Sequence, residues 1–142
     1  MTTESAQTMD ITQTYDLPHA PARVWRALTE SDLLTRWNMA NDFQPVVGRP
    51  FTFRTEPSPW WDGIVTGEVL VSEECKTLSY TWVGGPLDTV VTWTLEPTPS
   101  GGTLLTLEHT GFKAGEDRAQ KGAAQGWRAK VEEGLRQLLA TS

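Results

Sequence analysis

His109 and Tyr80 are the residues of this chain that combine a proton-carrying group with a place in an otherwise apolar pattern. Each lies in a run that alternates like a strand, so each shares one strand face with large apolar residues. A phenol and an imidazole in that position could orient the polar end of a hydrophobic ligand, or carry a proton in general acid–base chemistry. A hydrogen-bonded structural role is the plainer alternative for His109.

Other familiar arrangements for catalysis or metal binding are missing from the sequence. Glu108 precedes His109 directly, but strand neighbours point to opposite faces, so the two do not form an acid–base pair. The lone Cys75 lies in a polar turn without an activating base, which argues against a nucleophile. Two histidines and one cysteine make a zinc site implausible, and no HExxH, GxSxG, P-loop or GxGxxG motif occurs. We predict no catalytic residue, metal site or cofactor, and whether the chain is an enzyme stays open.

The composition restricts the class of protein. A chain of 142 residues with 38% hydrophobic and 21% charged residues fits one globular domain. The formal net charge of −6 argues against nucleic acid as a partner, because phosphate binding needs concentrated Lys and Arg. No apolar run is long enough for membrane insertion. Residues 1–9 lack the apolar core of a secretory signal, so we expect a flexible lead before a single domain over residues 10–142. The single cysteine is compatible with the cytoplasm, where we expect the protein.

The elements that must position His109 and Tyr80 follow in a simple order. Residues 10–17 alternate as a strand, and Pro21 suits the first turn of the first of two short helices, over residues 20–28 and 31–37. Residues 38–50 lack a period and are predicted to be a loop. Five or six strands with short turns then lead to one long helix over residues 116–140, which predicts an antiparallel meander and an α+β fold.

The long C-terminal helix carries an apolar stripe and three glycines. The stripe consists of Ala123, Trp127, Val131, Leu135 and Leu138. Each of Gly122, Gly126 and Gly134 costs a helix about 1 kcal/mol relative to alanine. Our interpretation is that the small residues leave room above the sheet for a ligand. Close helix–sheet packing without a space is the alternative.

Short motifs occur in a fixed order along nearly the whole chain. They are Ala20-Pro21, Val24-Trp25-Arg26-Ala27-Leu28, Arg36-Trp37, Val47-Gly48, Phe51, Phe53, Gly67-Glu68-Val69, Leu78-Ser79-Tyr80-Thr81-Trp82, Gly102-Thr103, Glu108-His109, Gly111-Phe112 and Gly126-Trp127. Together they resemble the START-like (SRPBCC) superfamily, and within it the branch of homologues of the activator of Hsp90 ATPase. Arg49, where a second glycine is common, and the pair Trp60-Trp61 depart from that pattern.

The resemblance implies a helix-grip fold, in which a curved antiparallel sheet of about seven strands wraps around the C-terminal helix. It also implies a cavity between helix and sheet for small hydrophobic molecules. Strand alternation, the helix stripe and a lid that the second short helix could form then give the expected ligand-binding residues. They are Trp37, Phe53, Tyr80, Trp82, Trp93, His109, Ala123 and Trp127.

Binding of an aromatic or lipid-like molecule is the function that we expect. A cyclase- or dehydratase-like enzyme with His109 or Tyr80 as proton carrier is one alternative. A stress-related cochaperone domain of the Hsp90-ATPase-activator type is another. Candidate partners are the small hydrophobic molecule, a second copy of the chain and a chaperone. If Trp60 and Trp61 were exposed, they would form an apolar patch suited to a partner or to the pocket mouth.

Overall fold

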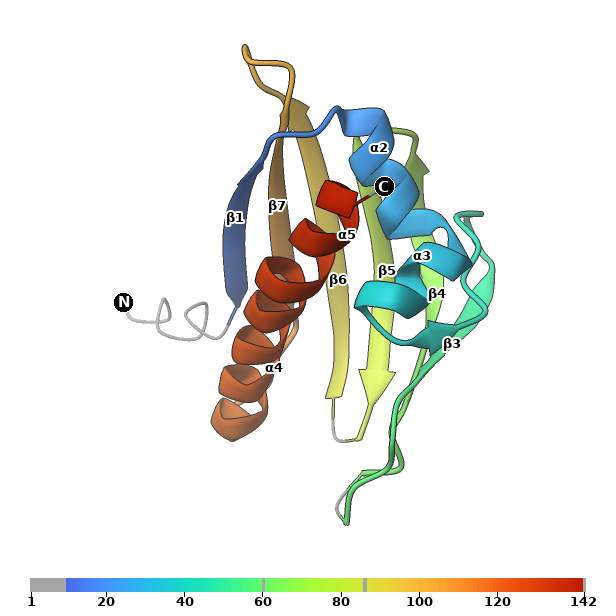
Figure 1. Cartoon of the computed structure of the whole chain (residues 1–142). Coiled ribbons are helices and arrows are strands. Elements are labelled where there is room, and N and C mark those ends of the chain that lie inside the picture. Colours follow the sequence, from blue (N-terminus) through green and yellow to red (C-terminus); the bar gives the residue numbers. More distant parts are fainter. Residues whose placement is uncertain (1–9, 60, 86, 142) are drawn as a thin grey trace.

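The fold, seen in a computed structural model, is an α+β arrangement built on one antiparallel sheet (Figure 1). The structure describes residues 10–59, 61–85 and 87–141, so the lead expected over residues 1–9 and the side chain of Trp60 lie outside it. The strands are β1 (Ile11–Leu17), β2 (Ala40–Asn41), β3 (Pro50–Arg54), β4 (Ile64–Glu73), β5 (Thr77–Gly84), β6 (Leu87–Pro97) and β7 (Thr103–Thr110). Their order across the described sheet is β1-β7-β6-β5-β4-β3-β2. The predicted helix-grip architecture is confirmed.

The first strand closes the sheet against the last one. Ile11 pairs with His109 and Leu17 pairs with Thr103, so one antiparallel ladder joins two segments about 90 residues apart in the sequence. The predicted alternation of β1 is confirmed, because every second residue from Ile11 to Leu17 is buried. The loop predicted over residues 38–50 is wrong in one detail, since β2 lies within it and pairs with β3. A strand of two residues carries no readable period.

Glycine allows two strands to approach closely at the centre of the sheet. A Cβ atom at Gly67 would lie 2.1 Å from the backbone oxygen of Thr81 and 2.5 Å from the Phe51 ring. Any larger residue there would push β4 away from β5 or displace the ring. The register of the same pair of strands shifts between Val69 and Val71, which is the kind of bulge that curves a sheet.

All the helices that the structure describes lie on one face of the sheet, as Figure 1 shows. They are α2 (Pro21–Thr29), α3 (Ser31–Trp37), α4 (Asp117–Ala129), the π-helical segment η1 (Lys130–Leu135) and α5 (Arg136–Thr141). The last three form the long helix predicted from the sequence, with η1 as an unpredicted wider turn. The two groups lie side by side, and both bury apolar residues in one core. Among the described residues, no helix is both long and apolar enough to cross a membrane.

The π-helical segment has a reason in the spacing of the apolar stripe. Steps of four residues overshoot a turn of 3.6 residues by about 40° each, so the stripe would drift around a regular α-helix. A wider turn reverses that drift, and Trp127, Val131, Leu135 and Leu138 are all buried. The same segment brings Gly134 close to α3, where an added Cβ would lie 3.1 Å from the Trp37 backbone oxygen.

Candidate functional site

A pocket of about 640 Å³ lies between α4 and one end of the sheet. The C-terminal segment contributes nine residues, from Gly115 before α4 to Lys130 after it, and five of the nine are glycine or alanine. The sheet and loops oppose them with larger apolar groups. The lining comprises Met39, Trp61, Val65, Trp82, Gly84, Gly85, Leu87, Gly115, Glu116, Arg118, Ala119, Gly122, Ala123, Gly126, Trp127 and Lys130. Its volume lies within the range of about 300–1,000 Å³ that is usual for small-molecule sites.

Glycines make the helical wall of the pocket bare. Cβ atoms added at Gly122 or Gly126 would meet no heavy atom within 4 Å. Gly134 differs, because its missing side chain is what lets η1 pack onto Trp37. The three glycines therefore have two physical roles: close packing at one end of the helix, and open space at the other.

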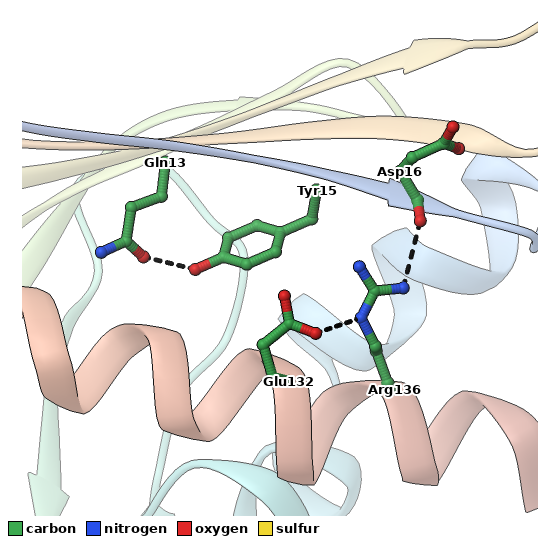
Figure 2. Close-up of polar contacts among 5 residues, drawn as sticks. All are labelled: Gln13, Tyr15, Asp16, Glu132 and Arg136. Carbon is green, nitrogen blue, oxygen red and sulfur yellow. Dashed lines mark hydrogen bonds and ion pairs between the residues drawn. The ribbon is translucent and has the colours of Figure 1, made fainter.

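The C-terminal helix is held by polar contacts along β1, at the edge of the sheet. Figure 2 shows Tyr15 donating its hydroxyl proton to the side-chain oxygen of Gln13, and Arg136 donating from its Nη1 to the backbone oxygen of Asp16 at 3.1 Å. Arg136 also pairs with Glu132 at 2.5 Å, which orients its guanidinium. Gln13 itself donates from Nε2 to the backbone oxygen of Ala124 in α4, at 2.9 Å. The helix is thus tied to β1, while the pocket lies on its side toward β5 and β6.

Two tryptophan rings form the inner wall of the pocket. The rings of Trp82 and Trp127 lie 5.1 Å apart between centroids, and Trp127 meets Trp93 edge-to-face at 5.4 Å. The Phe53 ring packs edge-to-face against the Trp82 ring, with the two centroids 5.5 Å apart. Aromatic pairs at these separations are favourable, so the wall is a packed surface rather than a set of loose rings.

The eight residues predicted to bind ligand divide into two groups in the structure. Trp82, Ala123 and Trp127 line the pocket. Five others lie in the core outside the lining, where each is at most 5% exposed: Trp37, Phe53, Tyr80, Trp93 and His109. Strand alternation identifies the face on which a side chain lies, but it does not reveal which part of that face the helices cover.

His109 is held in one protonation state by three neighbours. The indole N–H of Trp127 donates to Nδ1 at 3.1 Å, and an indole nitrogen can only donate, so Nδ1 carries no proton. Nε2 therefore carries it and donates to the Thr89 hydroxyl at 2.7 Å, which donates in turn to the backbone oxygen of Trp82 at 2.8 Å. Desolvation of the fully buried ring lowers its pKa to about 4. The imidazole is neutral at pH 7 and fixes the position of Trp127, as in the structural alternative.

Tyr80 is likewise part of the packed interior. Its hydroxyl accepts a hydrogen bond from the Trp93 indole at 3.0 Å, and its ring packs edge-to-face against Phe43 and Phe51. Burial raises its pKa well above the ordinary value of a tyrosine. The phenol therefore keeps its proton at neutral pH.

Lys130 is a pocket residue that the sequence analysis missed. It lines the pocket, and its Nζ lies 5.4 Å from the centroid of the Trp127 ring. Desolvation of this half-buried amine lowers its pKa to about 8. A signal for it existed, because Lys130 follows Trp127 by three residues and Gly126 by four, which places all three on one helix face.

Trp61 and Met39 complete the wall opposite the helix. Met39 is 9% exposed and comes from the loop after α3, while Phe43 of the same loop is buried in the core. The indole nitrogen of Trp61 is buried without a hydrogen-bond partner. Among the residues that the structure describes, no cluster of three or more His, Cys, Asp or Glu side chains could hold a metal ion.

The sequence and the fold have clear relatives. Residues 18–140 match the protein family described as Activator of Hsp90 ATPase homolog 1-like protein. Protein MLL2253 from Mesorhizobium loti is 41% identical, with a TM-score of 0.84 over 94% of this chain and 98% of its own. Protein BH1534 from Bacillus halodurans is 27% identical, with a TM-score of 0.77 over 94% and 99%.

A more distant structure shares the fold alone. The Aha1 dimer from Colwellia psychrerythraea is 20% identical, with a TM-score of 0.79 over 93% of this chain and 96% of its own. Among curated proteins, none matches this sequence.

Proposed function

The chain belongs to the Activator of Hsp90 ATPase homolog 1-like family, and from that premise we propose that it binds a small hydrophobic molecule beneath α4. One observation carries the proposal: a volume of about 640 Å³ that the bare helix positions Gly122 and Gly126 keep open opposite the Trp82 ring. A helix that only packed against the sheet would gain stability from alanine at both positions. An aromatic wall with a bare roof suits a flat or extended apolar guest.

The protonation states favour binding over acid–base catalysis. Neither His109 nor Tyr80 lines the pocket, and burial opposes a change of charge on either. A general acid or base must reach its substrate and must titrate near the working pH. The two proton carriers considered for a cyclase- or dehydratase-like enzyme meet neither condition in this conformation.

Two further partners are proposed, a second copy of this chain and a chaperone. The Colwellia psychrerythraea relative is described as a dimer, so a second copy of this chain is a candidate partner, and the family name keeps a chaperone as another. Light scattering after gel filtration tests the first of these, and stimulation of an Hsp90-type ATPase tests the second. The cytoplasm is the compartment that we propose, on the basis of the lone Cys75.

Filling the pocket from the helix side tests the proposed function. In Gly126→Leu, the new side chain enters open space, so the helix should fold while the pocket loses volume. Titrations of 1-decanol and 2-naphthol, followed by tryptophan fluorescence, should show binding to the wild type that is at least about tenfold weaker in the variant.

A matched leucine on the outer side of the helix provides the control. Gln125 is exposed and does not line the pocket, so Gln125→Leu should bind both probes like the wild type. Equal affinity of Gly126→Leu and the wild type would refute the site. A wild type that binds neither probe, nor any member of a wider panel of alkanols and aromatic alcohols, would refute the function.

A further inference from the structure

We propose that the pocket selects an extended apolar molecule that ends in a carboxylate, and that the ammonium group of Lys130 binds this carboxylate. The inference rests on the proposed function, because it names the class of ligand that the same pocket takes. Three features support it: Lys130 lacks a carboxylate partner in the described structure, charge is concentrated at the ends of the helical wall, and the rest of the wall is uncharged.

Lys130 is a half-buried cation without a carboxylate partner in the described structure. The two ion pairs among the described residues, Arg26–Glu30 and Arg136–Glu132, do not include it. Its Nζ makes a cation–π contact with the Trp127 ring, 5.4 Å from the ring centroid. A ring face stabilises an amine less well than a carboxylate does, so Lys130 retains capacity for an anion.

Charge is distributed unevenly along the pocket. The other charged residues in the lining, Glu116 and Arg118, precede Lys130 by 14 and 12 positions, or about 21 and 18 Å along a helix axis. Glu116 is engaged at the start of the helix, where its Oε1 accepts from the backbone N–H of Lys113 at 2.7 Å. Between these ends the helical wall consists of small residues and Trp127. A ligand with a long apolar chain and one anionic end would match this distribution, with the anionic end at Lys130.

The part of the wall that comes from the sheet and its loops supplies no competing charge. The lining residues from the sheet and loops are Met39, Trp61, Val65, Trp82, Gly84, Gly85 and Leu87, and none of these described residues titrates near neutral pH. The buried indole N–H of Trp61 lacks an acceptor. The one unsatisfied polar atom that the structure gives in this wall is therefore a donor, which does not compete with a ligand for the Lys130 ammonium.

The titration of Lys130 agrees with this assignment. Burial lowers its pKa to about 8, because the charged amine loses water that the pocket does not replace. A carboxylate at the same place would supply the missing stabilisation and raise the pKa again.

Decanoate and 1-decanol form the matched pair of probes, since they share an apolar chain and differ in the charge of the end group. Affinities are measured by calorimetry at pH 7 for the wild type, Lys130→Met and Lys121→Met. Lys121 is exposed on the same helix and does not line the pocket, so its variant has the same change in net charge. Lys130→Met should weaken decanoate by about tenfold or more and change 1-decanol by less than about threefold, while Lys121→Met should match the wild type.

The outcomes separate the inference from the function on which it rests. Binding of 1-decanol with no binding of decanoate, or equal effects of Lys130→Met on the two probes, overturns the carboxylate assignment and leaves the pocket function standing. Absence of binding by both probes and by the wider panel overturns the proposed function, and the inference with it.

A second measurement needs no methionine variant. Wild-type affinity for decanoate should fall by about tenfold between pH 7 and pH 9.5, because Lys130 loses its proton, while the affinity for 1-decanol should stay level. Lys130→Arg should keep its decanoate affinity at pH 9.5, since a guanidinium stays charged. A decanoate affinity that does not change with pH in the wild type would overturn the assignment.

Discussion

Two titratable side chains close to the Trp127 ring show how surroundings decide the use of a charged group. The ring nitrogens of His109 both have hydrogen-bond partners, so its burial yields a neutral, fixed imidazole. Lys130 contacts the face of the Trp127 ring but pairs with no carboxylate within the described structure, so it is a half-buried amine that still lacks an anionic partner. Sequence pattern favoured the first as a ligand contact and overlooked the second.

Stability should depend on pH through His109. Its folded pKa of about 4 lies below the ordinary value near 6.5, so the unfolded chain binds a proton first as the pH falls. That contribution is complete above pH 6.5 and is lost as the pH falls toward 4. Between pH 7 and pH 5, the wild type should lose about 2 kcal/mol more of its free energy of unfolding than His109→Gln does.

Urea unfolding of both proteins at the two pH values measures this difference. His19 and every carboxylate occur in both chains, so their contributions cancel in the comparison. Equal losses in the two proteins would show that the native state protonates His109 without penalty.

At the scale of the element, the C-terminal helix has two halves with different functions. The α4 half leaves Gly122 and Gly126 bare over the pocket, while the η1 and α5 half buries Val131, Leu135 and Leu138 in the core. Its polar contacts with β1 hold the whole helix in place, although one half has little beneath it. An open pocket therefore does not require a mobile helix.

The two halves should respond differently to alanine. Gly126→Ala should raise the free energy of unfolding by about 0.5–1 kcal/mol, because its Cβ meets open space and alanine favours helix. Gly134→Ala should be less stable than Gly126→Ala by about 1 kcal/mol or more, because its Cβ would lie 3.2 Å from the Trp37 Cβ as well as near the Trp37 backbone oxygen.

Denaturant unfolding of the two variants and the wild type tests this comparison, with unchanged m-values as evidence that all three unfold alike. A stabilising effect of equal size at both positions would contradict the close contact between η1 and α3.

For the molecule as a whole, the sheet and two helical groups form one core with a gap at one side. One core cluster includes Leu17, Trp93 and Leu139, and the pocket residues Gly122 and Ala119 are not part of it. A fold of this kind can keep a cavity because the rest of its interior is packed. Ligand binding should then add to stability without reshaping the sheet.

Saturation with ligand should raise the melting temperature. A ligand at 100 times its dissociation constant adds about 2.7 kcal/mol to the free energy of unfolding, which corresponds to about 8–10 °C for a domain of this size. Scanning calorimetry with decanoate should show that rise in the wild type, and Lys130→Met should show a smaller one at the same concentration. A wild-type melting temperature that stays constant up to millimolar decanoate would contradict binding to the native state.

The sequence alone determined which side of each element is apolar. Alternation in β1, the strand meander and the four-residue steps of the C-terminal stripe were sufficient for the α+β class, because burial follows from the period of side chains along one element. The helix-grip fold came from the family resemblance. The short motifs of the chain gave the family, which the match over residues 18–140 confirms.

Only the tertiary structure decided where the open space lies. Tyr80 and Trp82 share one strand face, yet Phe43 from a distant loop covers Tyr80, while Trp82 faces bare glycines. A period along one strand contains no information about which distant segment covers each of its residues. The pocket, the hydrogen bonds of His109 and the isolation of Lys130 all depend on contacts between elements far apart in the chain, and these exist only once the helix and the sheet are packed together.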